Sequence, residues 1–264
     1  MAKSQKELAF LRDLYVNKEW TNRFTDLIDK HVKFADEENL LYINAGTGDH
    51  VFALRERVSD DIAIFATAED EDVLTIAREK AAAVSADVDF SLIRFEDESF
   101  DTVLADASFV GRGELTEFVD DAVRVAKIGG TVGIIFVTAG SFGEIFSLLW
   151  EVLFDEDLGE HGANAERLIA EQPTLSQLEK IAGDLGVVNL KTHTAVEVFE
   201  YDDGAAFISS PLVSDFLIPE WLETLSEDEK EQVTNKLAQL IDAEDADLTF
   251  RFSVKATLLT GEKG

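Results

Sequence analysis

A glycine turn between an apolar run and an amphipathic segment is the stretch of this sequence best suited to chemistry. Residues 40–43 are apolar, the turn Asn44-Ala45-Gly46-Thr47-Gly48 follows, and residues 49–58 carry apolar side chains at helical spacing. This order predicts a strand, a tight turn and a helix. Without a Cβ at Gly46 or Gly48, a ligand can approach the backbone of the turn. The helix start offers free N–H groups and a positive dipole end, so the stretch predicts a site for a polar ligand.

The elements that must position this turn alternate along the chain from residue 38 to 138. The predicted strands are 40–44, 62–68, 88–92, 102–105 and 131–138, and the predicted helices are 49–58, 70–84 and 113–127. Such alternation predicts parallel strands joined by right-handed crossovers. Ligands of these sheets bind outside the carboxyl ends of the strands. Four segments are expected to meet at that edge: 44–48, 68–69, 89–90 and 106–108.

The flanking segments are predicted to be mostly helical. Residues 4–33 begin with a capping box formed by Ser4 and Glu7. One apolar face is predicted to carry Leu8, Leu11, Leu14 and Tyr15, and a second run to carry Phe24, Leu27, Ile28 and Val32. We expect these N-terminal helices to pack on the core, with a lid over the ligand site as the alternative. An apolar helix around 142–153 is expected in the core, with the face of a homodimer as the alternative.

Two later strands and an insertion complete the predicted order. Residues 174–185 read as a helix that a second capping box begins, and 187–199 read as the sixth strand. Residues 248–259 alternate between apolar and polar side chains, which suits an antiparallel last strand. The insertion 203–247 carries a helix of its own. It is expected either to cap a substrate pocket or to form a small satellite core.

Composition excludes several classes of function. The 264 residues include 54 acidic and 23 basic side chains, a net charge of −31, so nucleic acid and anionic membranes are poor partners. We expect solubility or a host with a salty cytoplasm to account for this charge, with a specific basic partner as the alternative. The absence of cysteine excludes disulfides, thiolate zinc sites and a cysteine nucleophile. The four histidines form no ligand pair, and no metal site is expected. With no apolar signal core near the N-terminus, a cytoplasmic protein is expected.

The turn resembles motif I of the class I S-adenosylmethionine (SAM) methyltransferases. Residues 73–81, 89–101 and 123–130 extend the resemblance in the family's order and spacing, the last as a helix end and a Gly-Gly turn. The sequence is most similar to the type 11, or ubiquinone-menaquinone methyltransferase-like, members. The resemblance implies an α/β fold with a Rossmann-like, doubly wound seven-stranded sheet, mostly parallel with an antiparallel last strand. It implies one domain over 1–264: N-terminal helices 1–37, a core of 38–202 and 248–264, and a helical cap insertion 203–247.

The resemblance also implies SAM as the cofactor and methyl transfer to an unidentified small or lipophilic acceptor. The residues carried over as cofactor-binding are Tyr42, Asn44, Ala45, Gly46, Thr47, Gly48, Ala68, Glu69, Asp89, Phe90 and Asp106. Family members usually carry an acidic residue at Tyr42, a glycine at Asn44 and an acidic residue at Ala68, where it holds the ribose hydroxyls. These departures define the alternative hypothesis, a catalytically lapsed methyltransferase-like protein that serves in binding or assembly. Asp106 and His50 are the catalytic candidates, Asp106 as a general base.

Overall fold

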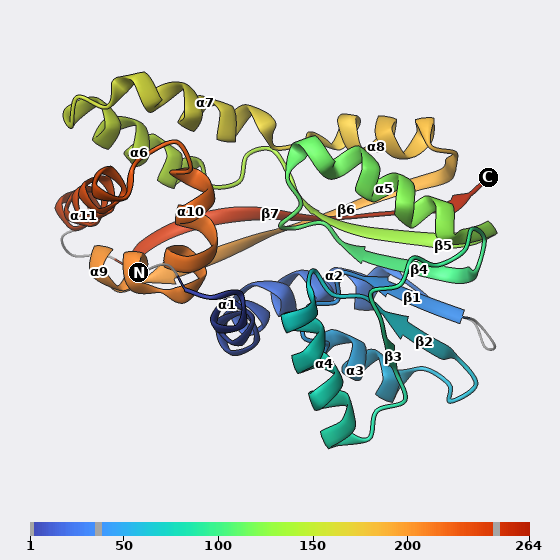
Figure 1. Ribbon diagram of the computed structural model, residues 1–264. Coiled ribbons are helices and arrows are strands. Elements are labelled where there is room, and N and C mark those ends of the chain that lie inside the picture. The colour runs from blue at the N-terminus through green and yellow to red at the C-terminus, as the bar shows by residue number, and fades with distance from the viewer. Residues whose placement is uncertain (1–2, 35–38, 245–248) are drawn as a thin grey trace. The chain divides into compact units, whose positions relative to one another are not determined.

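A seven-stranded mixed sheet organises the chain in a computed structural model that describes residues 3–34, 39–244 and 249–264 (Figure 1). The strands are β1 Asn39–Ile43, β2 Ala63–Ala66, β3 Asp89–Phe90, β4 Phe100–Asp106, β5 Ala126–Val137, β6 Val187–Tyr201 and β7 Phe250–Lys263. Their order in the sheet is β3-β2-β1-β4-β5-β7-β6. Strand β1 pairs in parallel with β2 and β4, and β5 pairs antiparallel with β7. The predicted doubly wound fold with an antiparallel last strand is confirmed.

Helices flank the sheet and connect its strands. They are α1 Gln5–Leu11, η1 Arg12–Thr21, α2 Asn22–His31, α3 Asp49–Arg57, α4 Glu71–Val84, α5 Arg112–Val125, α6 Gly143–Asp155, η2 Gly159–His161, α7 Gly162–Glu171, α8 Leu175–Asp184, α9 Gly204–Ser209, η3 Leu212–Leu217, α10 Ile218–Trp221 and α11 Glu227–Glu244. Helices α5 and α8 lie on one side of the strands β1 to β5, and α2, α3 and α4 on the other (Figure 1). None of the helices in the described part of the chain is long and apolar enough to cross a membrane.

The buried side chains of β1 alternate between these two sides. Leu41 and Ile43 belong to a core cluster with apolar residues of β4, β5, α5 and α8. Tyr42, between them, therefore points to the side of α2 and α3, and it is also buried. A strand buried on both faces is typical of a parallel sheet covered by helices. Side chains on both faces of the sheet therefore hold the end of β1, and with it the start of the turn that follows.

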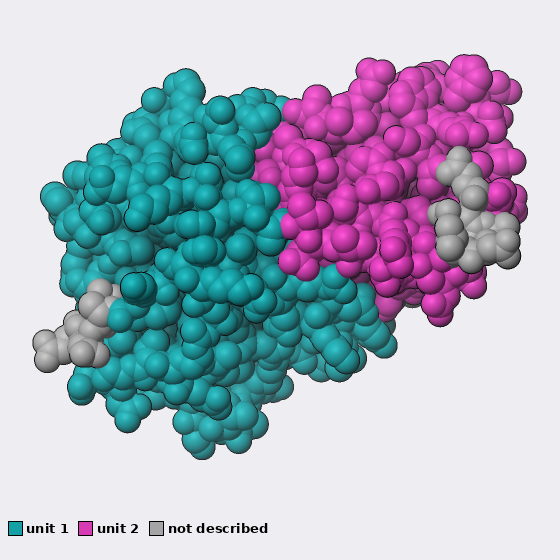
Figure 2. Space-filling model, turned by 180° about the vertical axis from the view of Figure 1, so that it is seen from behind, with its two compact units in different colours: residues 1–137, 174–195, 256–264 teal, residues 138–173, 196–255 magenta. Residues whose placement is uncertain are grey.

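The chain divides into two compact units (Figure 2). Unit 1 comprises residues 1–137, 174–195 and 256–264, and unit 2 comprises 138–173 and 196–255. Within unit 2, α11 packs against α9 and α6, and the apolar residues of α6 are mostly buried, as predicted for a core helix. The role of 203–247 as a cap stays a prediction. The predicted boundaries at 37–38 and 247–248 lie outside the described residues.

The apolar face predicted for the N-terminal helices is confirmed in its second run, where Phe24, Leu27, Ile28 and Val32 are buried, and wrong in its first. Helices α1, η1 and α2 follow one another without a break, and η1 is a π-helix of ten residues. Leu14 is 61% exposed and Tyr15 is 38% exposed, whereas Asn17 and Trp20 are buried. A π-helix forms hydrogen bonds from residue i to i+5 instead of i+4, so it turns a different set of side chains inward. Periodicity based on the α-helix therefore selected the wrong face.

The predicted turn before the fifth strand is also wrong. Gly129 and Gly130 lie inside β5, which begins directly after α5. The pairing of β4 with β5 passes from Phe100 opposite Ala126 to Thr102 opposite Thr131, so β5 carries extra residues there. Gly129 has φ +77°, a left-handed conformation that glycine adopts readily. The two glycines thus form a bulge in the strand instead of a turn.

Candidate functional site

The four predicted strand-end segments meet at the carboxyl edge of the sheet. The backbone N–H of Ala45 donates to the carbonyl of Thr67 at 2.8 Å, and that of Asn44 donates to the Thr67 hydroxyl at 3.2 Å. The Asn44 side-chain amide donates to the carbonyl of Asp106 at 3.4 Å. These bonds tie the turn after β1 to the loops after β2 and β4. The fourth segment belongs to β3, the outer strand of the sheet, and its Phe90 ring lies beside Gly48.

The turn Asn44–Gly48 uses left-handed backbone conformations at three positions. Asn44 has φ +54°, Gly46 +58° and Gly48 +92°. Asparagine is one of the few side-chain residues that tolerate this region, which explains how Asn44 stands where the family usually has glycine. A Cβ on Gly48 would lie 2.8 Å from Phe90 and 2.9 Å from Phe52. Glycine was predicted at this position because it leaves room for a ligand. In the structure, the close packing of the Phe90 and Phe52 rings requires it.

The N-terminal π-helix η1 lies over Gly46. A Cβ on Gly46 would lie 3.4 Å from Asn17 Oδ1 and 3.8 Å from Arg12 Nε. Both of these polar atoms are buried, and neither has a hydrogen-bond partner within the described part of the chain. Buried polar atoms are nearly always paired, because leaving one unpaired costs about 1–3 kcal/mol. One N–H donor and one oxygen acceptor therefore face the glycine turn with unused hydrogen-bonding capacity.

A polar cluster fastens η1 to the turn. Asn17 Nδ2 donates to Thr47 Oγ1 at 2.5 Å and to Asp49 Oδ2 at 3.2 Å. The Thr47 hydroxyl donates in turn to Asp13 Oδ1 at 2.5 Å. Lys80 Nζ on α4 donates to Asp13 Oδ1 at 2.6 Å and also contacts Asp49. Two elements far apart in sequence, η1 and α4, thus hold the turn in place.

Arg12 joins η1 to the loops after β2 and β4. Its Nη2 donates to Glu69 Oε1 at 2.6 Å, and its guanidinium carbon lies 5.2 Å from the centre of the Phe109 ring. The Arg12 side chain is 11% exposed and that of Glu69 is 23% exposed. Burial raises the pKa of Glu69, and the charge of Arg12 offsets part of that rise. Ala68, the preceding residue, is buried and brings no polar side chain to this edge.

The two predicted residues of β3 differ in their surroundings. Phe90 is buried and packs against Phe52 at a ring-centroid distance of 5.7 Å, next to Gly48. Its backbone carbonyl accepts from Nε of Arg78 at 3.0 Å. Asp89 is exposed, and no described side chain forms an ion pair with it. The structure therefore brings Phe90 to the glycine turn and leaves the Asp89 carboxylate open to solvent.

The two predicted catalytic candidates are both buried. Asp106 Oδ1 accepts from the backbone N–H of Ser108 at 2.8 Å, and burial raises the pKa of Asp106. His50 lies between Tyr42, whose hydroxyl is 3.2 Å from Nδ1, and Asp29, whose Oδ1 is 3.1 Å from Nε2. Because Asp29 accepts the Nε2 proton, the Nδ1 of a neutral ring accepts from the Tyr42 hydroxyl. The hydrogen bond from His50 lowers the pKa of Asp29. Burial raises the pKa of Tyr42 far above its ordinary value, and nearby carboxylates add to the rise.

Comparison with known proteins identifies the central part of this chain. Residues 41–134 match the family model described as a methyltransferase domain. No match was found among curated protein sequences.

Several solved structures share the fold of this chain. YcgJ from Bacillus subtilis is 15% identical with a TM-score of 0.58, over 92% of this chain and 98% of that chain. Phosphoethanolamine N-methyltransferase 2 of Haemonchus contortus in complex with SAM is 14% identical with a TM-score of 0.57, over 98% of this chain and 57% of that chain. Geranyl diphosphate C-methyltransferase of Streptomyces coelicolor is 10% identical with a TM-score of 0.50, over 94% and 80%. At these identities the likeness establishes the fold alone.

Sequence periodicity does not predict that Arg12, Asp13 and Asn17 reach the turn Asn44–Gly48. In an α-helix, residues five apart lie on different faces, so Arg12 and Asn17 would not be expected to act together. The π-helix places both of them over Gly46. Within the described ranges, no group of three His, Asp or Glu side chains is arranged to hold a metal ion. The polar groups over the turn suit an organic ligand with its own donors and acceptors.

Proposed function

We propose that this protein binds SAM at the turn Asn44–Gly48 and transfers its methyl group to a small or lipophilic acceptor. The match of residues 41–134 to a methyltransferase domain supports methyl transfer as the class of reaction. The observation that carries the proposal is the pair of unpartnered buried atoms, Arg12 Nε and Asn17 Oδ1, which both face Gly46. The Arg12 Nε–H can donate a hydrogen bond and Asn17 Oδ1 can accept one. They therefore suit a ligand that carries an acceptor group and a donor group close together.

The chemistry of SAM fits these residues from end to end. Its amino-acid part has a carboxylate, for the Arg12 Nε–H, and an ammonium group, for Asn17 Oδ1. Glu69 follows Ala68, the position at which the family usually has its ribose-binding acid, so we assign the ribose hydroxyls to Glu69. We assign the adenine amine to Asp89. The sulfonium of SAM supplies an already activated methyl group when it is bound. The protein therefore needs to align an acceptor more than to activate it.

For acceptors that lose a proton, we assign the base to Asp106 and not to His50. Burial raises the pKa of Asp106, which makes it a better proton acceptor at neutral pH. Both ring nitrogens of His50 are engaged, one by Tyr42 and one by Asp29. His50 then has a positioning role at the start of α3, beside the turn.

The acceptor is proposed by analogy with proteins of the same fold. The relatives named above act, by their names, on phosphoethanolamine and on geranyl diphosphate, which are a small polar and a lipophilic molecule. We propose that 203–247 serves as the cap over such an acceptor and that the protein is cytoplasmic. The lapsed-enzyme hypothesis remains as an outcome of the test below.

Isothermal titration calorimetry with SAM measures the Kd and tests the proposal. In thermal unfolding, SAM at a hundredfold excess over Kd should stabilise the wild-type protein by roughly 2.7 kcal/mol. Gly46→Ala places a methyl group between the two unpartnered atoms, and Arg12→Gln removes the donor, so each should weaken binding about tenfold, or roughly 1.4 kcal/mol. Lys18→Gln is the matched control, because Lys18 is an exposed residue of the same π-helix. Thermal unfolding without ligand separates loss of binding from loss of folding.

Each outcome of this titration has a distinct meaning. No binding by the wild-type protein would contradict the proposal. Equal binding by all four proteins would place SAM elsewhere. Binding in the expected pattern without methyl transfer to small polar or lipophilic acceptors would favour the lapsed-enzyme hypothesis.

A further inference from the structure

The indole ring of Trp20 reaches from the π-helix η1 to the loop that follows β4. Trp20 is buried, and its Nε1 donates to the hydroxyl of Ser108 at 3.0 Å. The ring centroids of Trp20 and Phe109 lie 5.1 Å apart. Arg12, on the same π-helix, also lies against the Phe109 ring, with its guanidinium carbon 5.2 Å from the ring centre. Helix η1 therefore holds this loop at Ser108 and Phe109, directly after the Asp106 that ends β4.

The chemistry of indole fixes the direction of the hydrogen bond at Ser108. The ring nitrogen of tryptophan is a donor only, so the Ser108 oxygen accepts there. The hydroxyl proton of Ser108 is then left for a second partner, and the Ser108 side chain forms a hydrogen bond with Asp106. The backbone N–H of Ser108 donates to Oδ1 of the same carboxylate at 2.8 Å. The three side chains thus form a chain in which Trp20 donates to Ser108 and Ser108 donates to Asp106.

The two hydrogen bonds from Ser108 act against the effect of burial on Asp106. Burial raises the pKa of Asp106, and both hydrogen bonds lower it, because they stabilise the ionised carboxylate. A general base must be ionised before it can accept a proton. The bonds therefore favour the ionised form that a base needs, and they restrict the orientation of the carboxylate.

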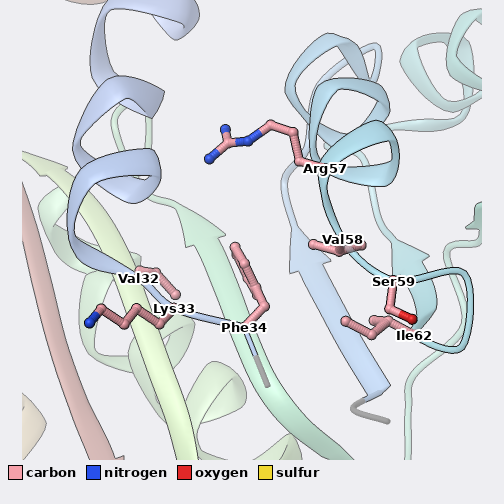
Figure 3. Close-up of a pocket in the computed structure, with 7 residues that line it drawn as sticks. All are labelled: Val32, Lys33, Phe34, Arg57, Val58, Ser59 and Ile62. Carbon is pink, nitrogen blue, oxygen red and sulfur yellow. The ribbon is translucent and has the colours of Figure 1, made fainter. Parts of the chain in front are cut away.

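Other charged and titratable groups also surround Asp106. Those within its electrostatic range are Arg12 of η1, Tyr42 of β1, His50 of α3 and Glu69 of the loop after β2. His50 is held by Asp29, which also pairs with Arg57 at the far end of α3. Arg57 is one of the residues that line a hollow of about 370 Å³ (Figure 3). All of these groups stay unchanged in the variants below, so a change at Asp106 reports the contacts of Trp20 and Ser108.

We propose that Trp20 and Ser108 are positioning residues for methyl transfer. The Trp20 indole fixes the hydroxyl of Ser108, and Ser108 holds the Asp106 carboxylate in place to accept the proton that the acceptor loses. This inference rests on the proposed function, in which Asp106 is the base. Because Arg12, Asn17 and Trp20 share one π-helix, the element that is proposed to hold the cofactor also orients the base.

Nuclear magnetic resonance titration of Asp106 in the full chain tests this inference without SAM. The aspartate carboxyl carbons are labelled with ¹³C, and Asp106→Asn identifies the signal of Asp106. Ser108→Ala removes the hydroxyl and should move the titration midpoint of Asp106 to higher pH. Trp20→Phe keeps an aromatic ring but removes the N–H, and it should move the midpoint in the same direction by a smaller amount. Ser108→Thr retains a hydroxyl and should restore the wild-type midpoint.

A double variant separates positioning from packing. Because Trp20 acts through Ser108, adding Trp20→Phe to Ser108→Ala should leave the midpoint where Ser108→Ala alone places it. Trp150→Phe is the matched control for the loss of an indole, because Trp150 belongs to unit 2, and it should leave the midpoint unchanged. Thermal unfolding of each variant measures the loss of packing, which would lower the melting temperature without depending on the Ser108 hydroxyl.

The possible results distinguish this inference from the proposed function. An unchanged midpoint in Ser108→Ala or in Trp20→Phe would overturn the inference. An equal shift from Trp20→Phe with and without the Ser108 hydroxyl would also overturn it. If the midpoints move as expected but the wild-type protein does not bind SAM, the proposed function fails. The contacts would then orient Asp106, but their role in methyl transfer would be excluded.

Discussion

Arg12 and Glu69 form an ion pair of 2.6 Å between Nη2 and Oε1, although 57 residues separate them. Glu69 stands one position after Ala68, where the family places its ribose-binding acid. A carboxylate is therefore present next to that position. In this structure it joins the N-terminal helix to the loop after β2, and its neighbour Ala68 contributes only an apolar contact.

Ala68→Asp should weaken the free protein and strengthen SAM binding. Ala68 is buried, so the new carboxylate lies close to Glu69 and Asp106 and should lower the free energy of unfolding by about 1–3 kcal/mol. In the complex it gains the ribose hydroxyls, and SAM should bind about 1–3 kcal/mol more tightly. Calorimetric titration and urea unfolding measure the two effects. Ala63→Asp, on the exposed start of β2, is the control and should change neither.

Gly48→Ala should destabilise the fold whether or not SAM is present. The new methyl group would meet Phe90 and Phe52 at less than 3 Å, and the backbone has φ +92°. Together, the close contacts and the strain should cost about 2–4 kcal/mol in the free energy of unfolding. Gly111→Ala is the control, because no atom lies within 4 Å of its Cβ position and φ is −62°. A loss of SAM binding at unchanged stability would instead support the original reason for Gly48.

The stability contributed by Asp106 should depend on pH with a definite sign. Burial raises its pKa above the ordinary 3.8, so the folded state favours the neutral acid. Its contribution is then fully present below pH 3.8 and is lost as pH rises through the raised pKa. On lowering the pH from about 7 to about 4, the wild-type protein should gain stability relative to Asp106→Asn. Urea unfolding at several pH values measures this difference.

In the same experiment, the stability difference between the wild-type protein and Asp29→Asn should depend on pH in the opposite direction. The hydrogen bond from His50 lowers the pKa of Asp29 below 3.8. The wild-type advantage over Asp29→Asn should be constant above that pH and decline as pH falls through the lowered pKa. Parallel curves for the two variants would contradict both assignments.

Salt should stabilise this protein. A net charge of −31 causes self-repulsion in the folded state, and raising the ionic strength from about 0.1 to about 1 M shortens the Debye length from roughly 10 to 3 Å. The melting temperature should rise by roughly 5–10 °C, which corresponds to about 2–3 kcal/mol. Sodium and potassium chloride should act alike if screening is the cause. A fall in melting temperature would show that ion pairs such as Arg12–Glu69 outweigh the repulsion.

Replacing 205–245 by a short Gly/Ser linker should expose the apolar face of α6. Helix α11 packs against α6 within unit 2, and Ile145, Phe146 and Leu149 are buried there. We therefore expect the shortened protein to bind a hydrophobic dye and to unfold at lower temperature than the full chain. A shortened chain with unchanged melting temperature and no dye binding would show that the insertion is dispensable for folding. In that case its role would be confined to the acceptor.

Most of the sheet could be predicted because its signals are local. The strands of residues 39–106 are buried apolar runs, and the helices between them have clear amphipathic spacing, so the predicted bounds of β1, α3 and α4 agree with the structure within one residue at most ends. The antiparallel strand β7 followed from its alternation. The turn Asn44–Gly48 was located from its glycines alone.

The covering of the site could not be predicted, because it depends on helix register. Arg12 and Asn17 meet over Gly46 only in a π-helix, and apolar periodicity does not distinguish that register from an α-helix. His50 stands at a predicted helix start, where polar residues usually lie at the surface. Its burial depends on Asp29, a partner 21 residues away in the chain. Long-range pairs of this kind leave no periodic trace in the sequence.

The position of the polar side chains of the π-helix η1 depends on the exact number of residues between Arg12 and Asn17. Removal of one residue between Arg12 and Asn17, for example the exposed Leu14, would shift every side chain before the deletion around the helix axis relative to every side chain after it. The composition and hydrophobicity of the segment would barely change. Comparison of this chain with others should therefore allow a single-residue gap inside the N-terminal helix, where gaps are ordinarily penalised. An alignment without that gap would match Arg12 or Asn17 to the wrong residue.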